Sequence, residues 1–182
     1  MKNRFNNSTR QPARQAIQQF NNRGFTLIEL IIVTGIIALI ATASMAILNP
    51  FGQFQKARDS RVKSDLSQVQ KALESYYQDK GNYPSSTAAY KMLDGTTTIN
   101  WNSSWQPYMN VVPQNPTSGH TYVYYSPNGQ TYYIYANLGR GAADPQACNA
   151  GAACASLSTN GISQAACGGT CNFGVSSPNV SP

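Results

Sequence analysis

The pattern of hydrophobic and polar positions changes twice along the first half of the chain. Residues 1–23 are polar, rich in Asn and Gln, and show no apolar period. From Phe25 to Leu48 nearly every residue is apolar or small, and the single charged residue is Glu29. As an α-helix this stretch would be about 36 Å long, enough to cross the roughly 30 Å hydrocarbon core of a bilayer. The pattern predicts a helix that is buried in lipid or among copies of itself.

A second, different helical pattern follows. Pro50 and Gly52 interrupt the first one just past its end. Apolar residues then recur every three or four positions on one narrow stripe, at Val62, Leu66, Val69, Leu73 and Tyr76. This spacing predicts an amphipathic helix from about Phe54 to Lys80, ended by Gly81, that needs a partner surface along one side only.

The segment after this helix has weaker signals. Residues 82–107 contain Pro and Gly and are predicted to be loop-like, with a short helix near Thr87–Leu93. Residues 108–112 suit a short strand, because they include adjacent apolar and β-branched residues.

The clearest strand signals lie further on. Residues 121–126 and 131–137 are β-branched and aromatic, and Pro127–Gly129 between them is a predicted hairpin turn. Six of the eleven tyrosines lie in this hairpin. Tyrosines suit a half-buried antiparallel sheet, and the alternative is a stacking platform for a sugar or single-stranded nucleic acid.

From Gly139 onward the composition shifts to small and polar residues, too few of them large and apolar to form a core of their own. An even number of clustered cysteines downstream of a membrane segment indicates two disulfides in an oxidising compartment. Three pairings are possible and all stay open. The alternative is a metal site, but the spacings match no common zinc pattern and His120, the only histidine, is far away in sequence. We therefore predict no metal and no cofactor, with four disulfide candidates: Cys148, Cys154, Cys167 and Cys171.

Together these patterns predict an α+β fold. A long N-terminal α-helix, transmembrane in its first half and amphipathic in its second, would pack on a small antiparallel β-sheet, followed by a disulfide-bonded C-terminal loop region. The predicted divisions are a cytoplasmic leader (1–24), a transmembrane and polymerisation helix (25–48), a globular head (49–144) and a Cys-containing, loop-rich extension (145–182).

The positive charge is concentrated at the N-terminus. The formal charge is +6 and the pI about 9.2, but five of the thirteen Lys and Arg residues precede Phe25, where there is no Asp or Glu. The remainder carries eight basic against seven acidic residues. It has no electrostatic footprint for phosphate backbones, so we expect no direct nucleic-acid partner. Basic residues just before the apolar run place its start in the cytoplasm and predict export of everything after it.

Glu29 is the unusual residue of the apolar stretch. A carboxylate in an apolar helix costs about 2.5–3.5 kcal/mol on insertion scales, so it is normally matched with a partner. No other charge lies between Phe25 and Leu48. The predicted partner is the α-amino group of a chain that begins at Phe25, either its own or a neighbour's. The alternative is an acid tolerated near the membrane surface. With one histidine, few acids elsewhere and no phosphate loop, no catalytic set can be assembled, and we predict no enzyme.

The sequence Arg23-Gly24-Phe25-Thr26-Leu27-Ile28-Glu29, followed by the apolar run, resembles the class III signal of type IV pilins and type II secretion pseudopilins. Residues 79–84 and 112–116 are similar, more loosely, to the head region of pseudopilins. The resemblance implies that prepilin peptidase reads Gly24 and cuts before Phe25. Phe25 would become the N-methylated terminus, and Glu29 would set the register of assembly.

The resemblance also implies partners and a location. The partners would be other copies of the chain in a helical filament, prepilin peptidase, an inner-membrane assembly platform, and the lipid bilayer before assembly. The subunit would cross the inner membrane once and then enter an extracellular pilus or a periplasmic pseudopilus. We place a structural subunit of a type IV pilus-like filament first, and a major-type pseudopilin of a type II secretion or DNA-uptake system as the alternative. A tip adhesin is less favoured, because such subunits often lack an acid at the position of Glu29.

Overall fold

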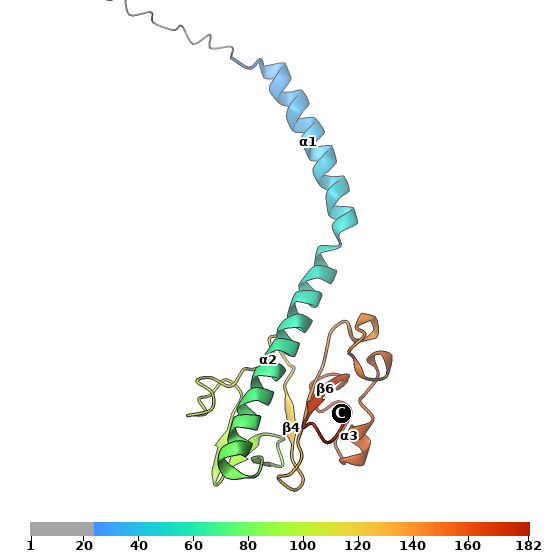
Figure 1. Cartoon of the computed structure of the whole chain (residues 1–182). Coiled ribbons are helices and arrows are strands. Elements are labelled where there is room, and N and C mark those ends of the chain that lie inside the picture. Colours follow the sequence, from blue (N-terminus) through green and yellow to red (C-terminus); the bar gives the residue numbers. More distant parts are fainter. Residues whose placement is uncertain (1–23) are drawn as a thin grey trace, which may run out of the picture. The chain divides into compact units, whose positions relative to one another are not determined.

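The computed structural model describes residues 24–182, without the side chains of residues 46–48. The predicted leader, Gly24 apart, lies outside the described residues. The chain forms two compact units divided between Leu48 and Asn49, and each is described by itself. Figure 1 shows the elements in chain order: α1 (Leu27–Leu48), α2 (Pro50–Lys80), β1 (Ser85–Ser86), β2 (Met92–Asp94), β3 (Thr97–Ile99), β4 (Val123–Tyr125), β5 (Tyr133–Ala136), the 3-10 helices η1 (Gly141–Ala143) and η2 (Cys148–Gly151), α3 (Ser156–Thr159) and β6 (Phe173–Ser176).

The two long helices are separated by one residue, Asn49. It adopts a left-handed conformation (φ 39°, ψ 67°), and its side-chain oxygen accepts a hydrogen bond from the backbone N–H of Gly52. Pro50 occupies the first turn, where its fixed φ fits a helix and its missing N–H costs nothing. The predicted start at Phe54 is therefore wrong by one turn, because Pro50 begins the helix. Gly81 ends it in the left-handed conformation, as predicted.

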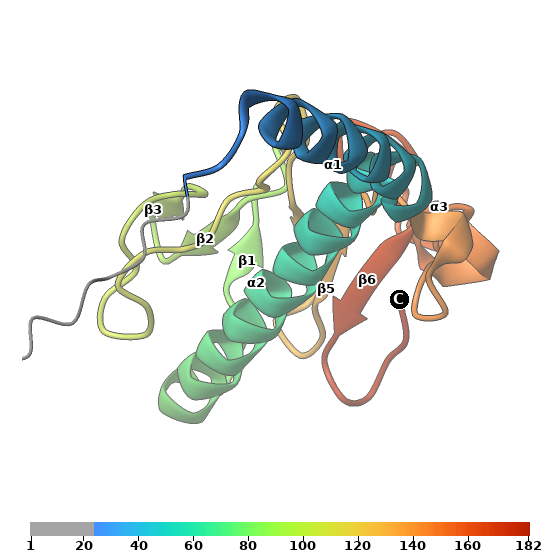
Figure 2. The same cartoon turned by 90° about the horizontal axis from the view of Figure 1, so that it is seen from above.

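α2 packs across one face of an antiparallel sheet in the order β4–β5–β6 (Figure 2). The whole predicted stripe of α2 is buried, and no member is more than 5% exposed. Alternate residues of the hairpin point toward it, because successive strand side chains face opposite sides of a sheet. The hairpin side chains that share this core are Tyr122, Tyr124, Tyr132, Ile134 and Ala136.

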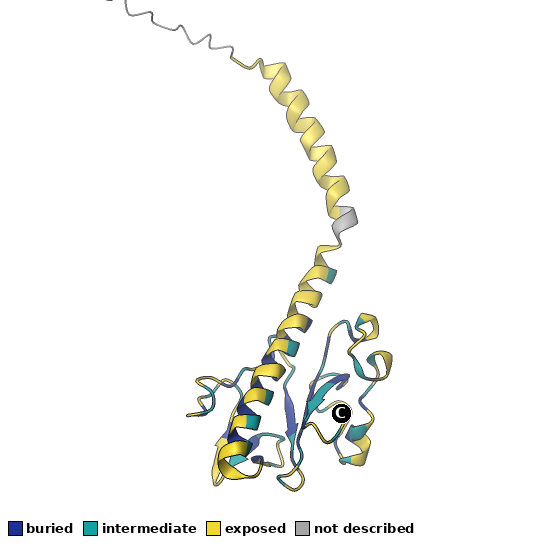
Figure 3. Cartoon of the chain, viewed as in Figure 1, coloured by how far each residue is buried: buried dark blue, intermediate teal, exposed yellow. Residues whose placement is uncertain are grey.

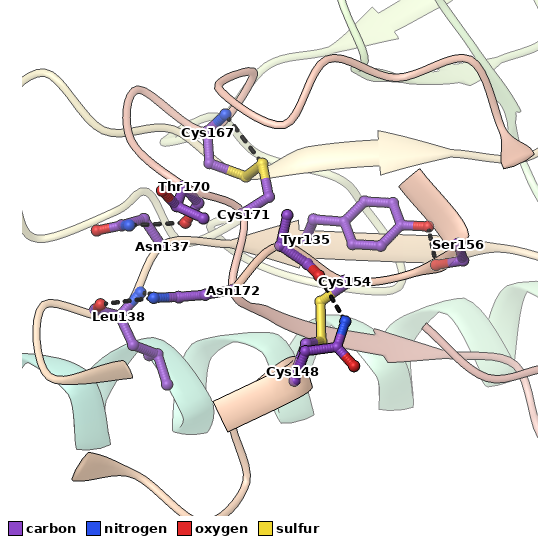
Figure 4. Close-up of a disulfide and its surroundings, with 12 residues drawn as sticks. Tyr135, Asn137, Leu138, Cys148, Cys154, Ser156, Cys167, Thr170, Cys171 and Asn172 are labelled. Atoms are coloured by element: carbon purple, nitrogen blue, oxygen red, sulfur yellow. Dashed lines mark hydrogen bonds between the residues drawn. A yellow bond between two sulfur atoms is a disulfide. The ribbon is translucent and has the colours of Figure 1, made fainter. Parts of the chain in front are cut away.

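The opposite face of the sheet is covered by the C-terminal region. Val123 and Tyr135 form a second core cluster with Leu157, Ile162 and the half-cystines. The two disulfides join Cys148 to Cys154 and Cys167 to Cys171, each closing a short loop (Figure 4). The small-residue segment thus completes a core with the sheet instead of forming one by itself.

The last strand, β6, comes from within this segment. It pairs with β5, with Val175 opposite Ile134. Beside it, Asn172 bonds in both directions with the backbone of Leu138, at 2.7 Å and 3.1 Å (Figure 4). The predicted α+β fold with a small antiparallel sheet is confirmed, and β6 is an addition to it.

Two local predictions are wrong. No helix forms at Thr87–Leu93; β2 begins there and pairs with β1 and β3 in a second three-stranded sheet. Gly95 (φ 60°) and Thr96 form the two-residue turn between β2 and β3, and a glycine at the first turn position is a hairpin signal that the sequence reading did not use. Residues 108–112 form no strand, only an isolated bridge between Trp105 and Met109.

Carboxylates along α2 bind groups of the sheet and loops. Asp65 accepts a hydrogen bond from the Tyr122 hydroxyl at 3.0 Å, and Glu74 accepts from Tyr83 and Tyr132. Burial, followed by the hydrogen bond to Glu74 or Asp65, raises the pKa of the Tyr83 and Tyr122 phenols well above their ordinary value. These phenols therefore stay protonated and act as donors throughout the physiological range.

Asp59 accepts hydrogen bonds from backbone N–H groups instead of side chains. It is 6% exposed, and its two oxygens accept the N–H groups of Gly139 (2.8 Å) and Arg140 (2.9 Å). The start of the C-terminal region is thereby anchored to the middle of α2.

Asp59→Ala is expected to lower the free energy of unfolding of the head by about 1–3 kcal/mol, because it removes the acceptor of two backbone donors. Asp59→Asn keeps one acceptor oxygen and should lose less. Urea unfolding in detergent, followed by the near-ultraviolet circular dichroism of the tyrosines, measures both. An unchanged urea midpoint for Asp59→Ala would show that these two hydrogen bonds do not stabilise the head.

Candidate polymerisation site

The residues of the predicted cleavage site lie just before α1. Gly24 and Phe25 belong to no helix or strand, a Cβ on Gly24 would meet no atom within 4 Å, and Phe25 is 84% exposed. Thr26 caps the helix: its hydroxyl oxygen accepts the backbone N–H of Glu29 at 3.2 Å. The cap satisfies one of the free N–H groups at the helix start. An acid in this first turn is also favoured by the helix dipole.

The hydroxyl side chains of α1 are satisfied by the helix itself. Thr34 donates to the carbonyl oxygens of the preceding turn at 3.0 Å, Thr42 does so at 2.9 Å and Ser44 at 2.8 Å. Such bonds are what a helix needs where there is no water to bond its polar groups. These three side chains therefore need no hydrogen-bond partner from a neighbouring helix.

Glu29 is not satisfied in this way. In residues 24–182 there are two ion pairs, Arg61–Asp65 and Lys63–Asp144, and neither includes Glu29. Within the same residues, no hydrogen bond reaches the Glu29 carboxylate. The hydrogen bond to Thr26 is made by the backbone N–H of Glu29. A charge in an apolar environment is normally matched, and α1 itself offers Glu29 no other charged side chain.

The rest of α1 presents an apolar surface on every side. Leu27–Met45 is long and apolar enough to cross a membrane, and all of it is exposed (Figure 3). An exposed apolar area of this extent marks a surface that is covered by lipid or protein. Eleven large side chains, each at least 46% exposed, contribute to it: Leu27, Ile28, Leu30, Ile31, Ile32, Val33, Ile36, Ile37, Leu39, Ile40 and Met45.

The remaining predicted site residues lie elsewhere. The four cysteines are all in disulfides of the C-terminal region and do not join the N-terminal residues. In the C-terminal region, Asp144 accepts a hydrogen bond from the Lys63 ammonium at 2.6 Å. That hydrogen bond holds the pKa of the Asp144 carboxyl below its ordinary value. Within the described residues, no group of three His, Cys, Asp or Glu side chains is placed to hold a metal ion.

One structural residue at the junction was missed by the sequence reading. Asn49 caps α2 and directly follows α1. The Asn49–Pro50 dipeptide carried the signal, since Asn favours the N-cap and Pro the first helical position.

The family assignment comes from comparisons with known sequences. The profile described as "Type II secretion system (T2SS), protein G" matches residues 49–151, which is more than half of the chain. A second profile, "Prokaryotic N-terminal methylation motif", matches residues 19–45. The chain belongs to the type II secretion protein G family. It has the family's two parts, an N-terminal methylation motif on an apolar helix and an α+β head.

Three relatives show how far the similarity extends. The type II secretion system core protein G of Escherichia coli (strain K12) is 30% identical over 122 residues, covering 64% of this chain and 81% of that protein. The protein of the same name from Pectobacterium carotovorum is 31% identical over 100 residues, which cover 53% of this chain and 63% of that one, less than two thirds. The type IV major pilin protein of Myxococcus xanthus is 41% identical over 70 residues, 37% of this chain and 30% of the pilin. No solved structure matches the chain significantly.

Proposed function

We propose that this chain is the major-type pseudopilin of a type II secretion system, a structural subunit that polymerises through α1 into a short periplasmic fibre. The observation that carries the proposal is the match of the head to protein G over residues 49–151. The type IV pilus, placed first from the sequence, has narrower support: the similarity to the Myxococcus pilin covers 37% of the chain, against 64% for the Escherichia coli protein. The ranking of the two filaments is therefore reversed.

Maturation would begin at the boundary between the leader and the apolar helix. Prepilin peptidase cuts between Gly24 and Phe25 and removes the residues that carry five of the six net positive charges. The new α-amino group of Phe25, N-methylated and still cationic, then lies four residues before Glu29. The cut thus supplies the cation that the described helix does not provide.

Assembly would follow when the Glu29 carboxylate and the Phe25 amino group pair between different subunits. Glu29 of one subunit pairs with the Phe25 amino group of a neighbour, which offsets the cost of the buried carboxylate and sets the axial position of one helix against the next. The apolar sides of α1 exchange lipid for other copies of α1. The subunit crosses the inner membrane once before assembly, and an inner-membrane assembly platform adds it to the fibre.

Gly24→Ala is expected to block most of the processing, because an alanine Cβ obstructs the entry of the backbone into a narrow peptidase site. Immunoblotting of cells that express the variant should show the precursor size. Gly35→Ala is the matched control: Gly35 lies inside α1 with no atom near a Cβ, so this variant should be cut normally. A mature-size band of normal abundance for Gly24→Ala would refute the leader assignment.

Glu29→Ala should be processed normally but should fail to enter fibres, since the subunit loses the group that pairs with the neighbouring amino terminus. Glu29→Gln tests charge separately from size, and we expect it to be similarly defective. Shearing and sedimentation of fibres from cells that overproduce the subunit measures assembly. Fibres of normal yield from both variants would disprove the register role.

Deletion of the gene in its native host separates the two kinds of filament. A pseudopilin of a secretion system is needed for export, so normally secreted enzymes should accumulate in the periplasm while surface filaments are unchanged in electron micrographs. Loss of surface filaments with normal secretion would instead assign the chain to a type IV pilus.

A further inference from the structure

The first turns of α2 are exposed and carry two phenylalanines. The first buried residue of α2 is Asp59, and no residue of the helix before it is buried (Figure 3). Phe51 is 81% exposed and Phe54 is 67% exposed. The two rings lie on the same side of the helix, because they are three residues apart. Large apolar side chains grouped in this way indicate a surface that is covered by something else.

Basic residues follow the two rings directly. Positions 51, 54, 58 and 61 are separated by three, four and three residues, so two rings and two guanidinium groups share one side of the helix. Residues 56–63 contain half of the eight Lys and Arg residues that follow Phe25, and one acid, Asp59. The four basic residues of this segment are Lys56, Arg58, Arg61 and Lys63.

Two of these four charges have no acidic partner. The two ion pairs within residues 24–182 involve Arg61 and Lys63. Lys56 and Arg58 take part in neither ion pair, and both are exposed. The acid of the same segment, Asp59, accepts backbone N–H groups of the C-terminal region with both of its oxygens. The segment therefore presents cations that are available to an anion from outside the chain.

The chain places this segment directly after the apolar helix. α1 ends at Leu48. At 1.5 Å per residue, Phe51 follows it by about 5 Å and Lys56 by about 12 Å. The headgroup region on one side of a bilayer is about 5–8 Å thick. Helical side chains lean toward the N-terminus, and Lys and Arg carry their charges on long apolar stems. Lys56 and Arg58 can therefore reach the lipid phosphates when Leu48 lies at the edge of the hydrocarbon core.

The order of side chains along the chain matches the layers of a membrane. An apolar span, then aromatic rings and then cations correspond to hydrocarbon, interface and phosphates. Membrane insertion does not explain the cations, because basic residues within about 15–20 residues of a span favour the cytoplasmic side and these are predicted to be exported. They oppose the orientation that the leader favours, so we look for their role after export.

We propose that the first three turns of α2 bind anionic phospholipids in the outer leaflet of the membrane that α1 crosses, before the subunit enters a fibre. Phe51 and Phe54 lie at the boundary between acyl chains and headgroups, and Lys56 and Arg58 bond the lipid phosphates. This binding fixes the depth of α1 in the bilayer. The inference rests on the proposed membrane crossing of α1.

The test is electron paramagnetic resonance of spin-labelled lipids in phosphatidylcholine vesicles that contain the full mature chain. Lipid in contact with the protein gives a motionally restricted component, and the size of this component measures association. Spin-labelled phosphatidylglycerol should associate several-fold more strongly than spin-labelled phosphatidylcholine, because it is anionic. At about 1 M NaCl the Debye length falls to about 3 Å, and most of this preference should disappear.

Paired substitutions locate the binding on α2. Lys56→Gln/Arg58→Gln removes the two cations without an acidic partner and should abolish most of the preference for phosphatidylglycerol. Lys56→Arg/Arg58→Lys keeps both charges and should keep the preference. The matched control is Lys71→Gln/Lys80→Gln, which removes two exposed charges from a later part of the same helix. It should associate with both lipids as the wild type does.

Four results would overturn the proposal. Equal association of the two lipids with the wild type would do so, while the restricted component itself would still show α1 in the bilayer. An equal loss of preference in the control would mean that net charge alone attracts the lipid. An unchanged preference in Lys56→Gln/Arg58→Gln, with a lower yield of sheared fibres, would assign these cations to a neighbouring subunit. No restricted component with either lipid would refute the membrane crossing of α1, and with it this inference.

Discussion

The apolar surface of α1 is the constraint to which the rest of the chain is adapted. All of Leu27–Met45 is exposed, while the hydroxyl side chains in this range bond to the helix's own carbonyls. Such a helix is stable in lipid or among other apolar helices, because its backbone polar groups bond to one another and need no water. Glu29 is the exception: it is the one charged side chain of α1, and it makes no ion pair within residues 24–182.

The second unit, Asn49–Pro182, has a core of its own. This core forms around α2, whose narrow stripe packs on the tyrosine-rich face of the β4–β5–β6 sheet. Tyrosine provides a large apolar area but also brings a hydroxyl into the core, and each such hydroxyl needs a partner. The acids of α2 provide them: Asp65 bonds Tyr122, and Glu74 bonds Tyr83 and Tyr132. The polar face of α2 is thus part of the packing as well as of the surface.

Much of the fold follows from local patterns. The helical periods of residues 25–48 and 62–76, the turn at Pro127–Gly129 and the strands on either side of it are properties of neighbouring residues, and the sequence predicts them. Even Asn49–Pro50, which was misread, and Gly95, which was unused, are local signals of a helix cap and a hairpin turn. What has no local signal is β6, whose residues Phe173–Ser176 resemble the loops around them and become a strand only by pairing with β5.

The sequence by itself determined the functional end of the molecule. The N-terminal methylation motif, the apolar helix and Glu29 are contiguous, so they can be recognised from their order along the chain. Only the tertiary structure decided how the cysteines pair and which side chains satisfy the buried tyrosines. The tyrosine contacts join residues distant along the chain, and the disulfides are two short loops chosen from three possible pairings. Whether such contacts form depends on how the chain packs in three dimensions, and the spacing of residues along the sequence does not show it.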